Sequence, residues 1–331
     1  MSAPIPGFGP GRNDAPDGVS ICVCTFRRAH LSRTLASLLA DCAGAGDVSV
    51  EIVVADNDER PSARDAVRAM EQRARDGGVA LRYVHCPAGN ISLARNAALD
   101  AAAHSRIAFV DDDERVRPGW LGALRAAMAR TGAAVVLGPV DAVYGAHVPV
   151  WMRDADLHST RPVWKNGAIR TGYTCNVLFD VRHPTLRGRR FDLARGRTGG
   201  EDTAFFDAAW REGATIAFAP DARVEEDVTP ERATVRWIAR RRFRSGQTHA
   251  SLPAAGNLLT RGGAARGAAL FVAGSKVAAC GMLALVNLAR RERAMASLLR
   301  GALHAGTVAG LLGMNQARLY GAPAPSRRSD G

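Results

Sequence analysis

Three carboxylates follow a short apolar run in the middle of the chain. Residues 106–114 read Arg-Ile-Ala-Phe-Val-Asp-Asp-Asp-Glu. This run predicts a strand buried on both faces, and ligands bind at the carboxyl ends of such strands in an open α/β sheet. If the extended backbone continues, Asp111 and Asp113 point one way and Asp112 the other. Two carboxylates on one side suit Mg²⁺ or Mn²⁺; the alternative is a solvated acidic turn before a helix that Pro118 would start.

A second acidic pair, Glu201-Asp202, comes directly after Gly199 and Gly200 and opens a predicted helix at 203–211. Acidic side chains in a first helical turn are favoured by the helix dipole, so capping alone could explain the pair. Two adjacent glycines also suit a backbone that approaches a ligand closely. The pair is therefore either a helix start or a second source of catalytic carboxylates.

Alternating strands and helices must position these groups. Apolar periodicity predicts strands at 19–25, 51–55, 79–84, 107–110 and 133–137. Helices are expected between them, one opened by Pro61, one capped by Ser92 and running to about Ala103, and one at 119–130. This order predicts a mostly parallel, doubly wound α/β sheet flanked by helices.

The second half is less regular. Residues 148–170 are expected to form a long loop over the ligand site, followed by strands at 171–180 and 214–219. The predicted organisation is a flexible leader at 1–18, an α/β domain at 19–250 with halves at 19–140 and 141–250, and a basic, apolar helical tail at 251–331.

Polar residues end three separate strands: Thr25 and Arg27, then Asp56, then Asp111 to Asp113. Because parallel strands end at the same edge of a sheet, these side chains could share one site. Neither GxGxxG after the first strand nor GxxxxGK[ST] is present. Neither Rossmann-type dinucleotide binding nor P-loop chemistry is therefore expected.

The net charge of +12 is concentrated at one end of the chain. From residue 230 onward there are 16 Lys and Arg against 3 Asp and Glu, so the preceding part is close to neutral. The surplus of positive charge therefore bears on what the C-terminal third binds and not on the rest of the chain. The six cysteines form no CxxC pair, and residues 1–18 lack the apolar segment of a secretory signal, so a reducing cytoplasmic location is expected.

Several segments together resemble a family-2 glycosyltransferase of the GT-A fold, and most closely the non-processive enzymes of bacterial exopolysaccharide assembly, the succinoglycan type. The resemblance covers roughly residues 19–246. The segments that carry it are VSICVCTFRR, EIVVADND, GNISLARNAALDAA, FVDDDE, TCNVLF, GGEDTAFF and RWIARRRFRSG. It implies an inverting, metal-dependent enzyme that transfers one sugar from a nucleotide sugar, with UDP expected, to a glycan or lipid-linked acceptor in cell-surface polysaccharide synthesis.

The resemblance also implies roles for residues on the donor side. Asp56 would accept a hydrogen bond from the nucleobase, Thr25 and Arg27 would line that end of the pocket, and Arg95 would approach the base or the diphosphate, unless it is a surface arginine. In the family the last Asp of the DxD contacts the metal and another binds ribose. The expected metal ligands are therefore Asp113 and Asp111, and Asp111 and Asp112 are expected to contact the nucleotide sugar.

For the acceptor side, the resemblance makes Asp202 the general base and gives Glu201 an orienting role. Inversion needs one carboxylate opposite the leaving group. Spacing alone does not choose between the two residues. The position that carries Gln in the QxxRW signature of processive synthases is Ala233 here, which argues against polymerisation.

The tail predicts two helices, at 267–289 and 294–314, packed as a hairpin. The first is apolar enough to span a bilayer except for Lys276, which at bilayer centre costs roughly 2.5–3.5 kcal/mol. Small residues four apart at 302, 306 and 310 suit close helix packing. Peripheral contact with the cytoplasmic face of the inner membrane is expected, and a soluble helical appendage is the alternative.

Two other functions were open on sequence grounds. A sugar nucleotidyltransferase also uses a nucleotide and acidic metal ligands, but it would need a Gly-rich basic loop after the first strand. The basic tail could suggest nucleic-acid binding, yet the chain has no aromatic-interleaved basic surface or known module, so no nucleic-acid partner is expected.

Overall fold

The computed structural model describes residues 18–44, 46, 48–252, 263–314 and 316, so the predicted leader lies outside the described residues except for Gly18. The chain forms two compact units. The first contains residues up to Val140 and Arg161–Glu225, and the second contains Asp141–Thr160 and Glu226–Ala317. The chain passes between them within strands β7 (Val140–Val143) and β12 (Val224–Asp227).

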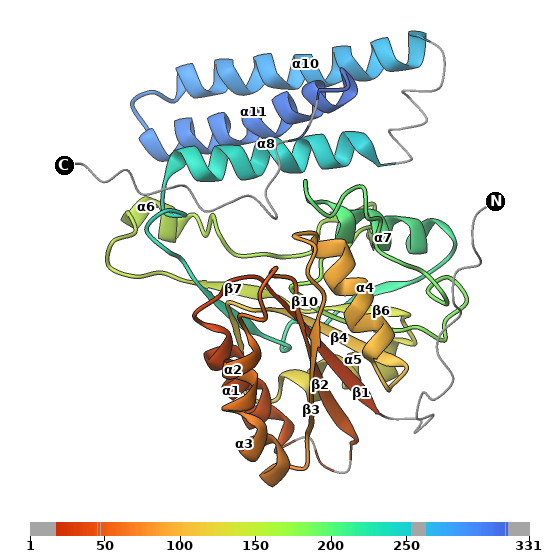
Figure 1. Cartoon of the computed structure of the whole chain (residues 1–331). Coiled ribbons are helices and arrows are strands. Elements are labelled where there is room, and N and C mark those ends of the chain that lie inside the picture. Colours follow the sequence, from red (N-terminus) through yellow and green to blue (C-terminus); the bar gives the residue numbers. More distant parts are fainter. Residues whose placement is uncertain (1–17, 45, 47, 253–262, 315, 317–331) are drawn as a thin grey trace. The chain divides into compact units, whose positions relative to one another are not determined.

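A seven-stranded sheet is the centre of the first unit (Figure 1), with strand order β11-β6-β10-β4-β1-β2-β3. The strands are β1 (Val19–Thr25), β2 (Val50–Asp56), β3 (Ala80–His85), β4 (Arg106–Asp111), β6 (Val135–Leu137), β10 (Asn176–Asp180) and β11 (Ile216–Phe218). All neighbouring pairs are parallel except those of β10, which runs antiparallel to β4 and β6. The mostly parallel α/β sheet predicted from the sequence is confirmed.

Helices cover both faces of this sheet because its central strands are apolar on both sides. Alternate residues of β1 and β4 belong to two separate core clusters. One cluster includes α1 (Leu31–Cys42), α2 (Arg64–Arg68), α3 (Glu71–Asp76) and α5 (Trp120–Thr131). The other includes α4 (Ile91–Ala101) and α7 (Glu201–Arg211). The sheet is thus held from both sides, which fixes the positions of its strand ends.

Two helix starts differ from the predictions. The first helix after β2 begins at Arg64 rather than at Pro61. The cap of α4 is Asn90, whose side chain accepts a hydrogen bond from the Leu93 backbone N–H at 3.2 Å, so Ser92 already lies inside the helix. Ser92 is freed for another contact, described below.

The predicted long loop at 148–170 is wrong in part, since it contains helix α6 (Val150–Asp154) and a hairpin of β8 (Trp164–Lys165) and β9 (Ala168–Ile169). It is also divided between the two units at Thr160. The remaining short strand, β5 (Glu114–Val116), follows the acidic cluster.

The second unit contains three long helices: α8 (Val235–Ser251), α10 (Gly263–Val286) and α11 (Arg291–Leu311). The two tail helices are therefore present as predicted. Helix α8, which was expected to belong to the α/β domain, lies in this unit with them. A small core around Val148, Met152, Ile238 and Leu299 joins α6 to α8 and α11.

Glycines bring α8 and α11 close together. Each of Gly246 and Gly306 lies where an added Cβ would overlap the opposite helix backbone, at Leu303 and Phe243 respectively, and Gly310 faces the Ala250 Cβ. The small residues at 306 and 310 do form a close helix contact, as predicted. Their partner is α8.

Candidate active site

The ends of three neighbouring strands meet at one edge of the sheet. In the strand register Thr25 lies opposite Asp56, and Cys24 lies opposite Asp111. Each of these residues is at or next to the carboxyl end of its strand. The convergence predicted from the parallel topology is therefore confirmed, and the acidic cluster lies beside the end of β1.

The acidic cluster does not continue as an extended strand. Strand β4 ends at Asp111, and Asp112-Asp113 form a turn before β5, so the predicted alternation of side chains is wrong. Asp112 is buried and accepts a 3.4 Å hydrogen bond from the Phe26 backbone N–H. Burial, with help from the Asp113 charge and against the charge of Arg28, raises the pKa of Asp112 to about 6.

Arg28 is a site residue that the sequence predictions missed. Its guanidinium lies 3.4 Å from a carboxylate oxygen of Asp112 and 3.4 Å from one of Asp113, while its side chain stays 45% exposed. The signal available in the sequence was the second arginine of the Phe-Arg-Arg turn that follows β1. An exposed cation beside two carboxylates at a strand edge is well placed to meet an anionic ligand.

Asp56 is buried and hydrogen-bonded within the protein. Its side chain is fully buried, and its oxygens accept hydrogen bonds from the Asp58 and Ala63 backbone N–H groups at 3.1 and 2.8 Å and from the Tyr83 hydroxyl at 2.7 Å. The predicted contact with a nucleobase stays a prediction, which this geometry does not favour.

Arg27 is placed by Asp58, another residue that was not predicted. The Arg27 Nε lies 2.9 Å from the buried Asp58 carboxylate, and Arg27 itself has a left-handed backbone with φ 56°. Burial opposes ionisation of Asp58, but hydrogen bonds from Arg27 and Ser62 lower the pKa of this carboxyl below its usual value. Thr25 is buried at the same strand end.

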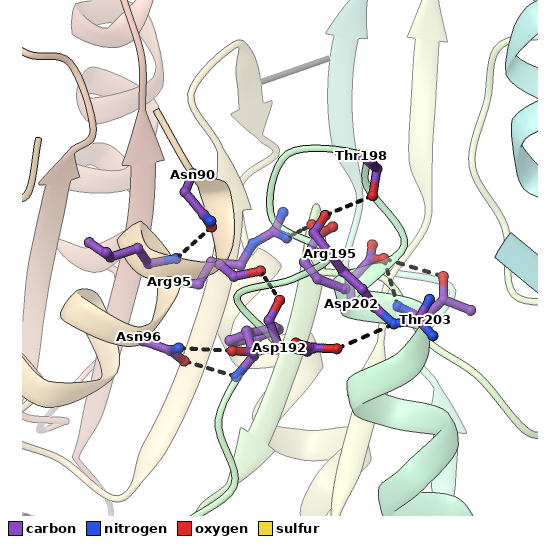
Figure 2. A network of polar contacts seen from close by, with 12 residues as sticks. Asn90, Arg95, Asn96, Asp192, Arg195, Thr198, Asp202 and Thr203 are labelled. Carbon is purple, nitrogen blue, oxygen red and sulfur yellow. Dashed lines mark hydrogen bonds and ion pairs between the residues drawn. The ribbon is translucent and has the colours of Figure 1, made fainter. Parts of the chain in front are cut away.

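Helix α4 is docked along the segment that leads to the second acidic pair (Figure 2). The Asn96 side chain exchanges two hydrogen bonds of 2.9 Å with the backbone of Phe191. Ser92 donates to the Asp192 carbonyl at 2.8 Å, Asn90 donates to the Leu193 carbonyl at 2.9 Å, and the next backbone N–H donates to the carbonyl of Gly196. Five hydrogen bonds from α4 and its N-cap residue therefore hold the segment 191–196.

At the end of this segment Arg95 is ion-paired with Glu201. Both side chains are buried, at 5% and 2% exposure, so the surface alternative for Arg95 is wrong, and its predicted approach to the donor is untested. Burial opposes ionisation of Arg95, but the charges of Glu201, Asp202 and Asp111 raise its pKa above its ordinary value. Arg95 thus interacts electrostatically both with Asp111 at the end of β4 and with the Glu201-Asp202 pair.

The two members of the second pair have different environments. Glu201 is buried against Arg95, and burial together with the Asp202 charge raises its pKa although Arg95 opposes the shift. Asp202 is partly exposed, and its Oδ1 accepts hydrogen bonds from the Thr203 backbone N–H at 2.6 Å and hydroxyl at 3.2 Å. Gly199 and Gly200 have φ values of 89° and 83°, which explains why glycines precede the pair.

Comparison with known proteins agrees with this geometry. Residues 20–195 match Glycosyl transferase family 2. The chain is 45% identical over 306 residues to the Succinoglycan biosynthesis protein ExoM of Rhizobium meliloti (strain 1021), covering 92% of this chain and 96% of that protein. The chain belongs to glycosyltransferase family 2. As a glycosyltransferase it is not a sugar nucleotidyltransferase.

Two solved structures of S. aureus TarS are similar to this chain. The crystal structure of S. aureus TarS has a TM-score of 0.47 and 15% identity, over 88% of this chain and 55% of that chain. The crystal structure of S. aureus TarS 1-349 has a TM-score of 0.46 and 14% identity, over 93% of this chain and 99% of that chain.

Proposed function

We propose that this family 2 glycosyltransferase is an inverting, metal-dependent, non-processive enzyme that moves one sugar from a UDP-sugar to a glycan or lipid-linked acceptor during exopolysaccharide assembly. The succinoglycan role in the printed name of its 45% identical relative supports the pathway class. The alanine at position 233, where processive synthases have Gln in QxxRW, supports transfer of a single sugar.

One observation carries the assignment of the base. Within the Glu201-Asp202 pair, the glutamate is buried and ion-paired with Arg95, whereas the aspartate is partly exposed. A general base must reach the acceptor hydroxyl, so Asp202 is the member that is free to do so. Glu201, held by Arg95, would orient Asp202. Sequence spacing left this choice open, and the difference in burial supports Asp202.

The carboxylates at the end of β4 fit a divalent cation that is shared with the donor. Among the described residues, no group of three or more His, Cys, Asp or Glu side chains could hold an ion alone. Mg²⁺ and Mn²⁺ in nucleotide enzymes commonly take one or two carboxylates and complete their shell with phosphate oxygens and water. Asp113 and Asp111 would provide those carboxylates. When bound, the cation would neutralise charge on the departing diphosphate.

Four side chains of the protein would act on the donor and the acceptor. Arg28 would add positive charge next to the diphosphate, since it lies beside Asp112 and Asp113 and is exposed. Arg27, held by Asp58, would line the nucleotide end with Thr25. Asp202 would take the proton from the acceptor hydroxyl on the opposite face of the sugar, which gives inversion in a single displacement.

Attachment to a membrane surface is the remaining part of the proposal. Helix α10 is the one helix of the described chain that is long and apolar enough to cross a membrane, and only 17% of its most apolar window is buried. Its exposed large side chains include Phe271, Met282 and Leu285, and Arg290, Arg291 and Arg293 follow it. Apolar side chains flanked by arginines favour an anionic cytoplasmic leaflet, where a lipid-linked acceptor would be found.

The decisive experiment compares Asp202→Asn with the wild-type enzyme. We expect transfer to be abolished while binding of UDP-sugars, followed by thermal shift with and without Mn²⁺, is retained. A panel of nucleotide sugars in the same assay identifies the donor. Near-normal turnover of the variant would remove Asp202 from the role of base, and stabilisation by donors without any metal would contradict the proposed cation.

Membrane attachment is tested separately by flotation with vesicles that contain anionic phospholipid. We expect the protein to float with anionic vesicles and to stay at the bottom with neutral ones at moderate salt. A protein that remains in the soluble fraction under both conditions would contradict attachment and leave the enzymatic proposal untouched.

A further inference from the structure

A cavity lies at the opposite end of β4 from the acidic cluster. Its volume is about 700 Å³, and its wall contains Arg106, the first residue of β4, and Asp180, the last residue of β10. Arg106 and Asp180 are paired in the antiparallel register. Because β4 carries Asp111 at its other end, the two sites are separated by the length of the strand, roughly 17 Å.

Small residues leave the space that forms this cavity. Its lining includes Gly122, Ala126 and Ala129, which are exposed on one face of α5, and continues through residues 132–134 after the helix. None of these three residues has a side chain larger than a methyl group, so the space beside them stays open. A cavity of several hundred Å³ is the size that small-molecule ligands occupy in proteins.

The charged groups around the cavity are mostly positive. They are Arg106, Arg125, Arg182 and His183, with Asp180 as the single acid. Arg182 contacts the Asp180 carboxylate at 2.7 Å. Burial opposes ionisation of Asp180, but hydrogen bonds from Arg182 and the charges of Arg182 and Arg106 lower its pKa. Three guanidinium groups therefore line the cavity with one carboxylate, which leaves a surplus of two positive charges among these four groups.

Arg125 has a polar atom that lacks a hydrogen-bond partner in the described part of the chain. Its Nε is buried and has no hydrogen-bond partner among the described residues. A buried N–H without an acceptor is costly, so such groups in proteins are nearly always satisfied by water or by a ligand. The planar guanidinium group is suited to phosphate or carboxylate oxygens, which it can bind through two parallel hydrogen bonds.

We propose that this cavity binds a small sugar-sized dianion, such as a sugar phosphate, through Arg125 and the neighbouring arginines. The size of the cavity accommodates a monosaccharide, and the surplus of two positive charges matches one phosphoryl group. The site is separate from the donor site, because it uses neither the acidic strand edge nor a metal ion. It therefore goes beyond the proposed transfer reaction.

The test is isothermal titration calorimetry of the full chain with glucose 1-phosphate, in the presence of EDTA so that the metal-dependent donor site is silent. We expect binding to the wild type, and loss of about tenfold or more in affinity in Arg125→Gln, the size expected for a charge-assisted hydrogen-bonded contact. Uncharged glucose should not bind. Inorganic phosphate should bind at the same site, more weakly if the sugar contributes.

Matched variants keep the outcome interpretable. Arg130→Gln removes the same charge from an exposed position of the same helix outside the cavity lining and should bind like the wild type. Ala126→Leu narrows the cavity without changing charge and should weaken binding. Asp113→Asn should leave it unchanged. Failure of the wild type to bind, equal affinity of Arg125→Gln and Arg130→Gln, or loss of binding in Asp113→Asn would each overturn the proposal, and none of these would affect the Asp202 assignment.

Discussion

The Arg95 guanidinium on α4 is ion-paired with the Glu201 carboxylate at the start of α7, and both side chains are buried. The two residues are 106 positions apart in the chain. The pair ties the helix that packs on the sheet to the helix that carries the proposed base in its first turn. Because a buried charge is stable only with its partner, each residue constrains where the other can lie.

Replacing Arg95 by Met should destabilise the protein by about 3–5 kcal/mol, because it leaves the Glu201 charge buried without a partner. Urea denaturation measures this, with Arg73→Met on the exposed face of α3 as the control for loss of an arginine. The double variant Arg95→Met/Glu201→Met should recover part of the loss, since both charges are then removed. A single variant as stable as the control would contradict the role of the pair.

Gly196→Ala should reduce turnover far more than donor affinity. An added Cβ at this position would overlap the Asn90 side-chain oxygen and crowd the Ser92 hydroxyl, so the segment before Glu201 must move away from α4. A displacement near the proposed base should lower kcat, by about a hundredfold for roughly 1 Å, while the strand edge proposed to hold the donor is unaffected.

Steady-state kinetics checks this split between kcat and the KM for the donor. Gly44→Ala is the control, since its nearest neighbour for an added Cβ is a backbone oxygen at 3.6 Å. A wild-type kcat in Gly196→Ala would mean that docking on α4 does not position Asp202.

The strand edge was predictable because it depends on local pattern and parallel topology alone. Apolar runs located the strands, and parallel pairing then placed Thr25, Asp56 and Asp111 at one edge. The course of the backbone after Asp111 was not predictable, because an extended strand and a tight turn are both compatible with three aspartates. The structure has the turn.

Contacts between distant segments were beyond the sequence predictions. The motif around Arg95 shows an arginine on a helix, but its partner is set by how α7 packs against α4. For the same reason the glycines at 306 and 310 predicted a close helix contact without naming α8 as the partner. Which of Glu201 and Asp202 is exposed also follows from this packing, so the spacing of the pair could not choose the base.

Gly306→Ala should destabilise the three-helix unit, whereas the same change at an open position should stabilise it. In an exposed helix Gly→Ala is favourable by up to about 1 kcal/mol. At Gly306 the new Cβ would overlap the Phe243 carbonyl of α8, so the helices must separate. Gly274 on α10 has no atom within 4 Å of an added Cβ and is the matched control. Thermal denaturation should give shifts of opposite sign; shifts of the same sign would mean that α8 and α11 do not pack as described.

Stability of the second unit should fall as the pH drops below about 6.5, the ordinary pKa of a histidine. His158 is buried between Tyr144 and Trp237, and its Nε2 lies 2.9 Å from the Arg232 carbonyl. Burial, with the charges of Arg241 and Arg232, lowers its pKa although the Arg232 carbonyl and Glu226 oppose the shift. The unfolded chain therefore binds more protons than the folded chain just below pH 6.5, and stability present at neutral pH is lost as the pH falls.

His158→Phe should reduce this pH dependence, because it keeps the ring stacked on Trp237 while removing the titrating group. Urea denaturation at neutral pH and at about pH 5.5 measures the slope, and His249→Phe at an exposed ring is the control. Some slope should remain, because burial and the charges of Lys276 and Arg300 also lower the pKa of His304. Equal slopes in the wild type and in His158→Phe would show that His158 is not the group that links folding of this unit to pH.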